Sequence, residues 1–110
     1  MNSNFSKEKK RCETQWVLED LDVSYRFIIW YLLDSTREKM ELDREQVFIL
    51  ECHEGGVIYS GTTHKQKIIH MQQGYKKEYE FTSEYCVNGT ICVIDNGETC
   101  TMMWKDEKEV

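Results

Sequence analysis

The stretch FIIWYLL, residues 27–33, constrains the fold of this chain more than any other, because in a helix it is apolar on nearly every side. The residues around it have the spacing of an α-helix. Four of them fall along one line of such a helix: Val23, Phe27, Trp30 and Asp34. Asp20 or Asp22 can cap its start. An all-round apolar helix has to be covered on more than one side. We therefore expect one main helix, about residues 22–39, that packs on a sheet and leaves a face for a second subunit.

Short runs of alternating or β-branched residues predict the sheet. Residues 11–17, RCETQWV, alternate and predict a first strand before the helix. Five runs after the helix are strand-like: residues 46–52, 66–73, 75–81, 90–95 and 99–104. Residues 53–65, HEGGVIYSGTTHK, hold three glycines and predict a loop or a weak hairpin. The expected fold is α+β, with the main helix packed on an antiparallel meander sheet of about five strands.

The length of 110 residues fits one domain. We expect a flexible charged arm over residues 1–10, a single α+β domain over residues 11–104 and a charged tail over residues 105–110. No run approaches the roughly 20 apolar residues that cross a bilayer, and no apolar segment follows the charged N-terminus as in a signal peptide. The predicted location is the cytoplasm of a bacterial host, without a membrane partner.

Cysteine and histidine show no spacing that points to a metal or a nucleophile. The five cysteines are Cys12, Cys52, Cys86, Cys92 and Cys100. Their odd number, the lack of a C-x-x-C pair and their apolar surroundings favour five buried thiols over a zinc site. The three histidines also lack ligand spacing, although a Cys–His pair formed in space stays open; they are His53, His64 and His70. Since no nucleotide-binding or hydrolase motif is present, we predict no catalytic, cofactor or metal site.

Residues 95–98, DNGE, lie between two apolar runs and pose a choice between a turn and a site. Asn-Gly between strands is a strong signal for a hairpin, since both positions favour positive φ. Asp95 and Glu98 are then solvated carboxylates beside the turn. A calcium loop needs more alternating oxygen ligands than this segment has, and an acid pair that transfers protons needs a pocket. We therefore predict a hairpin turn.

The net charge of −6 is concentrated in the first half of the chain. Residues 12–54 hold eleven acidic and four basic side chains. Such a surface disfavours direct nucleic-acid binding, which needs Lys and Arg against phosphates, and it attracts a basic protein. A solvated acidic face that only keeps the protein soluble explains the same charge. The candidate partner-binding residues are Glu19, Asp20, Asp34, Glu38, Glu41, Asp43 and Glu45.

Four fragments, in order along the chain, resemble one family. They are VLEDLDVSYRFIIWYLLDS with Trp30 (17–35), ELDREQVFIL (41–50), KIIHMQQ with YKKEYEF (67–81) and ICVIDNGETCTMM (91–103). Together they resemble the domain of unknown function 960 family, small proteins of Firmicutes and their phages. The resemblance implies a shared fold and a mobile-element origin, and no chemistry. The chain lacks the family's Ile-Pro step before the helix and has extra residues around HEGGVIYSGTTH, which indicates a diverged member.

These observations lead to three hypotheses. In the first, the protein is a non-enzymatic phage or mobile-element protein that binds and blocks a host protein. A basic nucleic-acid-handling defence enzyme is one such partner, as for an anti-CRISPR, and the seven acidic residues then mimic phosphates. In the second, it is a self-assembling homodimer that buries the spare helix face. In the third, it is a small enzyme with an unrecognised Cys/His site or with Asp95 and Glu98 as its acids.

Overall fold

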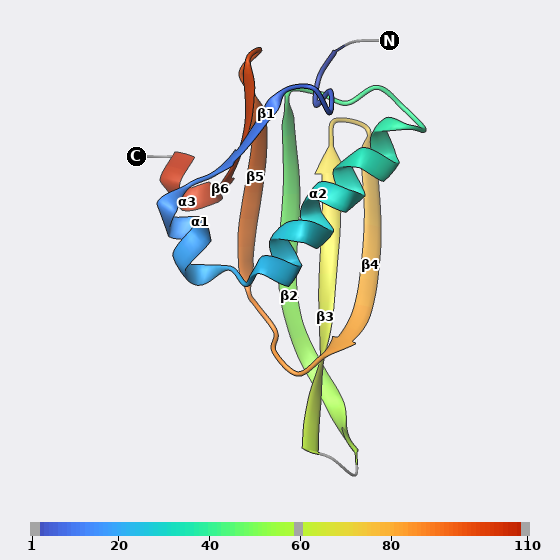
Figure 1. Ribbon diagram of the computed structural model, residues 1–110. Coiled ribbons are helices and arrows are strands. Elements are labelled where there is room, and N and C mark those ends of the chain that lie inside the picture. The colour runs from blue at the N-terminus through green and yellow to red at the C-terminus, as the bar shows by residue number, and fades with distance from the viewer. Residues whose placement is uncertain (1–2, 59–60, 109–110) are drawn as a thin grey trace.

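A six-stranded sheet with one long helix across one face forms the body of the molecule (Figure 1). The computed structural model describes residues 3–58 and 61–108, without the side chains of residues 54–58, 61–63 and 108. Its elements are β1 (Lys10–Glu13), α1 (Gln15–Asp20), α2 (Val23–Arg37), β2 (Glu45–Ile58), β3 (Gly61–Gln72), β4 (Tyr75–Ser83), β5 (Gly89–Asp95), β6 (Thr99–Trp104) and α3 (Lys105–Lys108).

The strand order of the sheet is β1-β6-β5-β2-β3-β4. Neighbouring strands are antiparallel except for β1, which runs parallel to β6. The predicted α+β fold with one main helix on a mostly antiparallel sheet is confirmed. The sheet has six strands, and it departs from a simple meander because β5 returns beside β2 instead of beside β4.

In the glycine-rich segment 53–65, the described residues 53–58 and 61–65 continue strands β2 and β3 as a hairpin. β2 runs to Ile58 and β3 starts at Gly61, with a register shift between Glu54 and Val57. The hairpin extends past the ends of the other strands (Figure 1). Of the two predicted alternatives, loop or hairpin, the hairpin is confirmed.

The first strand is shorter than predicted. β1 ends at Glu13, because the Thr14 side chain accepts a hydrogen bond from the Val17 backbone N–H and caps helix α1. Trp16 therefore lies on α1, where it is 63% exposed. The prediction of a strand over residues 11–17 is wrong beyond Glu13, since the capping signal of threonine outweighs a short alternating pattern.

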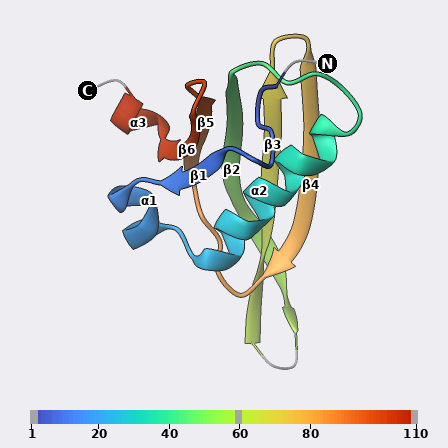
Figure 2. The ribbon, with the colours of Figure 1, turned by 45° about the horizontal axis from the view of Figure 1, so that its top comes forward.

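Helix α2 begins after Asp22, whose side chain accepts a hydrogen bond from the Ser24 backbone N–H, and it ends at Arg37. In Figures 1 and 2 it lies across β2, β3 and β4. Four of its buried side chains belong to the core cluster with Phe48 and Ile68 of the sheet: Tyr25, Ile29, Leu32 and Leu33. Thr36 is buried as well, outside that cluster. Among the described residues, no helix is long and apolar enough to cross a membrane.

The N-terminal residues pack on the domain where the structure describes them. Phe5 is 1% exposed and belongs to the core cluster. Its backbone N–H donates a hydrogen bond to Asp95 Oδ2 at 2.7 Å, and Lys9 Nζ lies 2.8 Å from the same oxygen. Residues 3–10 of the expected arm therefore lie against the domain, because Phe5 packs in the core and Lys9 forms an ion pair with buried Asp95. Residues 1–2 lie outside the described residues.

Residues 95–98 form the predicted hairpin turn between β5 and β6. Gly97 has a φ of 104°, which favours glycine. The Asn96 side chain accepts hydrogen bonds from the backbone N–H groups of Glu98 and Thr99. These local hydrogen bonds hold the turn.

Asp95 differs from the prediction, because it is fully buried rather than solvated. Burial alone would raise its pKa. The hydrogen bonds from the Lys9 side chain and from the backbone N–H groups of Phe5 and Gly97 outweigh burial, so the pKa of Asp95 lies below its usual value. The carboxylate is thus a structural charge that ties the N-terminus to the end of β5.

Replacing Asp95 with Asn removes the charge that Lys9 meets. We expect the free energy of unfolding to fall by about 3 kcal/mol, measured by urea denaturation at pH 7. The matched control is Glu98→Gln in the exposed part of the same turn, which should stay within about 0.5 kcal/mol of the wild-type value. Equal losses in the two variants would contradict the role given to Asp95.

Two of the five cysteines form a disulfide, which the sequence did not indicate. Cys52 of β2 is joined to Cys86 of the β4–β5 loop, and their Cα atoms are 5.3 Å apart. Cys92 and Cys100 are buried free thiols, as predicted, and Cys12 is a half-buried one. The prediction of five buried thiols is wrong for the bonded pair, because the fold brings together segments that are 34 residues apart in the chain.

Candidate functional site

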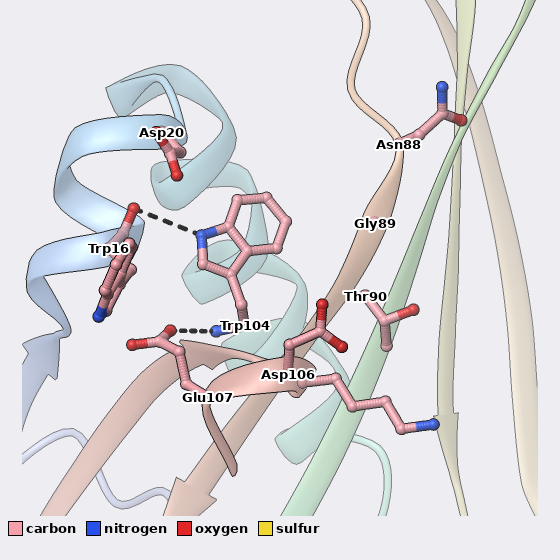
Figure 3. Close-up of a pocket in the computed structure, with 9 residues that line it drawn as sticks. Trp16, Asp20, Asn88, Gly89, Thr90, Trp104, Asp106 and Glu107 are labelled. Atoms are coloured by element: carbon pink, nitrogen blue, oxygen red, sulfur yellow. Dashed lines mark hydrogen bonds between the residues drawn. The ribbon is translucent and has the colours of Figure 1, made fainter. Parts of the chain in front are cut away.

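A cleft of about 590 Å³ opens where α1, α3 and the adjoining ends of β5 and β6 meet (Figure 3). Its lining residues are Trp16, Asp20, Asn88, Gly89, Thr90, Trp104, Lys105, Asp106 and Glu107. In Figure 3 the Trp104 ring projects between α1 and Gly89. The cleft therefore combines two indole rings with carboxylates from α1 and α3.

Hydrogen bonds hold Trp104 in the cleft. Its indole Nε1 donates to the Trp16 carbonyl oxygen at 3.4 Å, and its backbone N–H donates to Glu107 Oε2 at 2.6 Å (Figure 3). The Thr14 hydroxyl donates to the same Glu107 oxygen at 3.0 Å. Glu107 thus joins the start of α3 to the start of α1. The described part of the predicted charged tail, residues 105–108, is therefore part of the cleft wall.

Gly89 leaves the room that the Trp104 ring needs. A Cβ atom at position 89 would lie 2.7 Å from Cζ3 of that ring. The φ of Gly89 is 149°, a conformation that residues with a side chain rarely adopt. Both the close approach and the backbone conformation require glycine at this position.

The variant Gly89→Ala tests this packing. We expect a loss of about 2 kcal/mol in the free energy of unfolding and a shift of the tryptophan fluorescence, because the ring has to move. Gly74→Ala is the matched control: its φ is 76°, but nothing lies within 4 Å of the added Cβ. It should cost about 1 kcal/mol and leave the fluorescence unchanged. An unshifted spectrum for Gly89→Ala would contradict the account.

The chemistry of the cleft suits binding of a cation. Indole faces attract ammonium and guanidinium groups, and Trp16 is largely exposed. The cleft lining holds three carboxylates, from Asp20, Asp106 and Glu107, against the one ammonium group of Lys105, so its net charge is negative. A lysine or arginine side chain of a partner fits this combination of aromatic and acidic groups.

The outer side of α2 carries a row of exposed apolar side chains, which we call the α2 stripe: Val23, Phe27 and Tyr31. Their exposed fractions are 65%, 71% and 61%. They stand at i, i+4 and i+8, so they lie along one side of the helix. Trp30 and Asp34 of the line read from the sequence are half-buried. The sheet covers one side of α2, and the stripe is the side that the described chain leaves open.

The seven predicted acidic residues do not form one row. Glu19 and Asp20 end α1, whereas Glu38 follows α2. Figures 1 and 2 both place α1 and the α2–β2 connection at distant ends of the molecule. Asp34 is ion-paired with Arg11. The structure therefore places these residues in separate groups at α1, at α2 and in the α2–β2 connection with the start of β2.

The remaining three acidic candidates lie in the α2–β2 connection and at the start of β2: Glu41, Asp43 and Glu45. Asp43 and Glu45 line a shallow groove with Val47 and Met71. Asp43 also accepts a hydrogen bond from the Gln73 backbone N–H. This groove is a second place where apolar and acidic groups adjoin.

His70, one of the candidate catalytic histidines, is a core residue. It is fully buried, stacked on Phe48 with ring centroids 4.2 Å apart, and its Nε2 lies 2.7 Å from Gln46 Oε1. Burial lowers the pKa of His70 to about 4. Cys100, a candidate thiol, is also buried, and burial followed by the nearby Asp95 charge raises the pKa of its thiol. Both groups are placed for packing.

Because His70 is neutral in the folded state, its protonation favours unfolding. The unfolded chain takes up the proton near pH 6.5 and the folded chain near pH 4. This contribution to stability is complete above pH 6.5 and is lost as the pH falls through that window. Between pH 7.5 and 5, the free energy of unfolding should fall by about 2 kcal/mol more in the wild type than in His70→Gln. Urea denaturation at both pH values measures this, and the half-exposed His53→Gln should behave as the wild type.

The elements together define a small α+β domain with one main helix across one face of a six-stranded sheet. The family model described as "Staphylococcal protein of unknown function (DUF960)" matches residues 10–107, so the chain belongs to this family, as its sequence fragments predicted. The fold is similar to that in the "Crystal structure of the protein of unknown function from Enterococcus faecalis", with 18% identity, a TM-score of 0.74 and 97% of each chain covered. No curated protein matches the chain.

Proposed function

We propose that the protein is a non-enzymatic interaction module that binds a protein partner through the α2 stripe. The observation that carries this proposal is the exposure of Val23, Phe27 and Tyr31 in one row. Single exposed apolar side chains are ordinary on monomers, whereas a contiguous group marks an interaction surface. An apolar helix side is also a common contact in helix-mediated recognition.

The charge beside the stripe favours a basic partner over a second copy of the chain. Three exposed carboxylates, which we call the acidic corner, lie between the end of α1 and the start of α2: Glu19, Asp20 and Asp22. In a dimer about this helix, two acidic corners and two chains of net charge −6 repel each other. A partner with an apolar patch and lysine or arginine at its edge meets both features. Such a partner also fits the cleft of Trp16 and Trp104, which takes one basic side chain.

A nucleic-acid-handling enzyme of the bacterial host has such a basic surface, and blocking it in the cytoplasm is the biological role that we propose. An anti-defence role of this kind rests on the mobile-element origin that the resemblance of the sequence fragments implies. Because the acidic residues lie in separate groups, the proposed contact is an apolar docking site with acidic edges rather than a row of phosphate mimics. Asp20 is the predicted partner-binding residue that both the cleft and the acidic corner include.

The test is capture of a partner from a lysate of a Firmicutes host by the immobilised protein, at low and at high salt. We expect the wild-type protein to retain a stoichiometric partner that has a basic surface. The variant Phe27→Glu should lose this partner, because it places a carboxylate in the apolar contact. High salt should weaken the capture, since acidic edges are screened. Thr82→Glu, an exposed change on β4, is the matched control and should retain the partner.

Light scattering of the purified protein separates this proposal from the homodimer alternative. We expect a monomer at micromolar concentration. A dimer that Phe27→Glu dissociates would show that a second copy covers the stripe and would replace the proposal. Capture of the same partner by wild type and Phe27→Glu alike would contradict a role for α2.

A further inference from the structure

Three soft ligands for a metal ion meet at the base of the β2–β3 hairpin. Among the described residues, Cys52 of β2, His64 of β3 and Cys86 of the β4–β5 loop place their sulfur and ring nitrogen atoms within 4.8 Å of one another. All three are half-buried. We propose that the reduced protein binds a zinc-like metal ion here, through two thiolates and one imidazole, and that the Cys52–Cys86 disulfide is the state that excludes the metal.

The position of Cys86 does not depend on the disulfide, because its neighbours are fixed by hydrogen bonds. The Gln66 side chain accepts from the Val87 backbone N–H at 2.7 Å and donates to its carbonyl oxygen at 3.0 Å. The Tyr25 hydroxyl donates to the Tyr85 carbonyl oxygen at 2.7 Å. Gln66 is fully buried, so these bonds are shielded from water. Reduction therefore leaves the loop in place.

Cys52 and His64 are fixed by the sheet. The Cys52 backbone N–H donates to Asn88 Oδ1 at 2.9 Å, which joins β2 to the same loop. His64 pairs with Ser83 in the β3–β4 register, two positions from the Gln66–Phe81 pair. Because strand residues two apart share a face, His64 projects from the same face as Gln66, which contacts the loop. The ligands thus come from three segments that the fold already holds together.

The distances suit a tetrahedral ion after small side-chain rotations. Two thiolates on zinc stand about 3.7 Å apart, from a zinc–sulfur distance of about 2.3 Å. The Cα atoms of Cys52 and Cys86 are 5.3 Å apart, which allows both sulfurs to reach one ion. Two cysteines and one histidine leave a fourth position for water or another ligand.

The disulfide state converts to the metal-bound state by a balanced reaction. A dithiol protein of the cytoplasm gives two electrons and two protons to the Cys52–Cys86 disulfide, which yields two thiols here and a disulfide in the reductant. A divalent metal then displaces both thiol protons and binds the two thiolates and neutral His64. Cysteine pairs in reducing compartments are more often metal ligands than stable disulfides, so the metal-bound state fits the proposed cytoplasmic location.

Titration with Co²⁺ tests the proposal on the full-length protein, reduced with a phosphine and kept without oxygen. We expect one equivalent of Co²⁺ to give the visible and thiolate charge-transfer absorption of a tetrahedral thiolate site, and Zn²⁺ to displace it. The variants Cys52→Ser, Cys86→Ser and His64→Ala should each lose the tetrahedral spectrum. Cys12→Ser and His53→Ala, matched changes outside the cluster, should keep it.

Thermal unfolding gives a second readout that does not need the variants. Zn²⁺ should raise the melting temperature of the reduced wild-type protein, because the metal binds the folded state. It should leave the melting temperature of the oxidised protein unchanged. Reduced protein with no tetrahedral cobalt spectrum and no zinc-dependent stabilisation would overturn the proposal, as would a spectrum that persists in His64→Ala.

Discussion

One fifteen-residue helix has to cover one face of a six-stranded sheet, and the rest of the structure follows from this constraint. Helix α2 covers β2, β3 and β4, so other segments have to fill the core beside β5 and β6 (Figure 2). Phe5 and Val17 do so, and both are almost fully buried. Because the sheet can bury only one side of α2, the apolar residues on the opposite side stay at the surface. The proposed docking surface is thus a direct result of how few helices the fold has.

Buried polar groups fix two segments that do not pack under helix α2, the N-terminal residues and the β4–β5 loop. Asp95 receives Lys9 and the Phe5 backbone N–H, which fixes the N-terminus to the end of β5. Gln66 fixes the β4–β5 loop at the opposite end of the strands. Each group has its hydrogen bonds satisfied within the protein, as buried polar groups require. Buried hydrogen bonds therefore position both the N-terminal segment that contains Phe5 and the loop that contains Cys86.

The sequence predicts the elements better than it predicts their neighbours. The main helix, the strands after it and the DNGE turn were evident from periodicity and turn chemistry. Periodicity could not select the buried side of α2, because residues 27–33 are apolar all round. The burial of Asp95 and the meeting of Cys52 with Cys86 depend on strand order, which local patterns do not encode. The sequence predicts that α2 has an apolar face beyond the one covered by the sheet, but it does not predict which residues form that face.

Radical footprinting of the α2 stripe tests the central claim most directly. The protein is labelled by hydroxyl radicals alone and in a lysate of a Firmicutes host, and the oxidation of each side chain is read by mass spectrometry. We expect Phe27 and Tyr31 to be oxidised readily in the purified protein and to be protected from oxidation in the lysate. Tyr79, half-buried on β4, should change little. Equal oxidation of Phe27 and Tyr31 in the two conditions would contradict the claim that this side of α2 binds a partner.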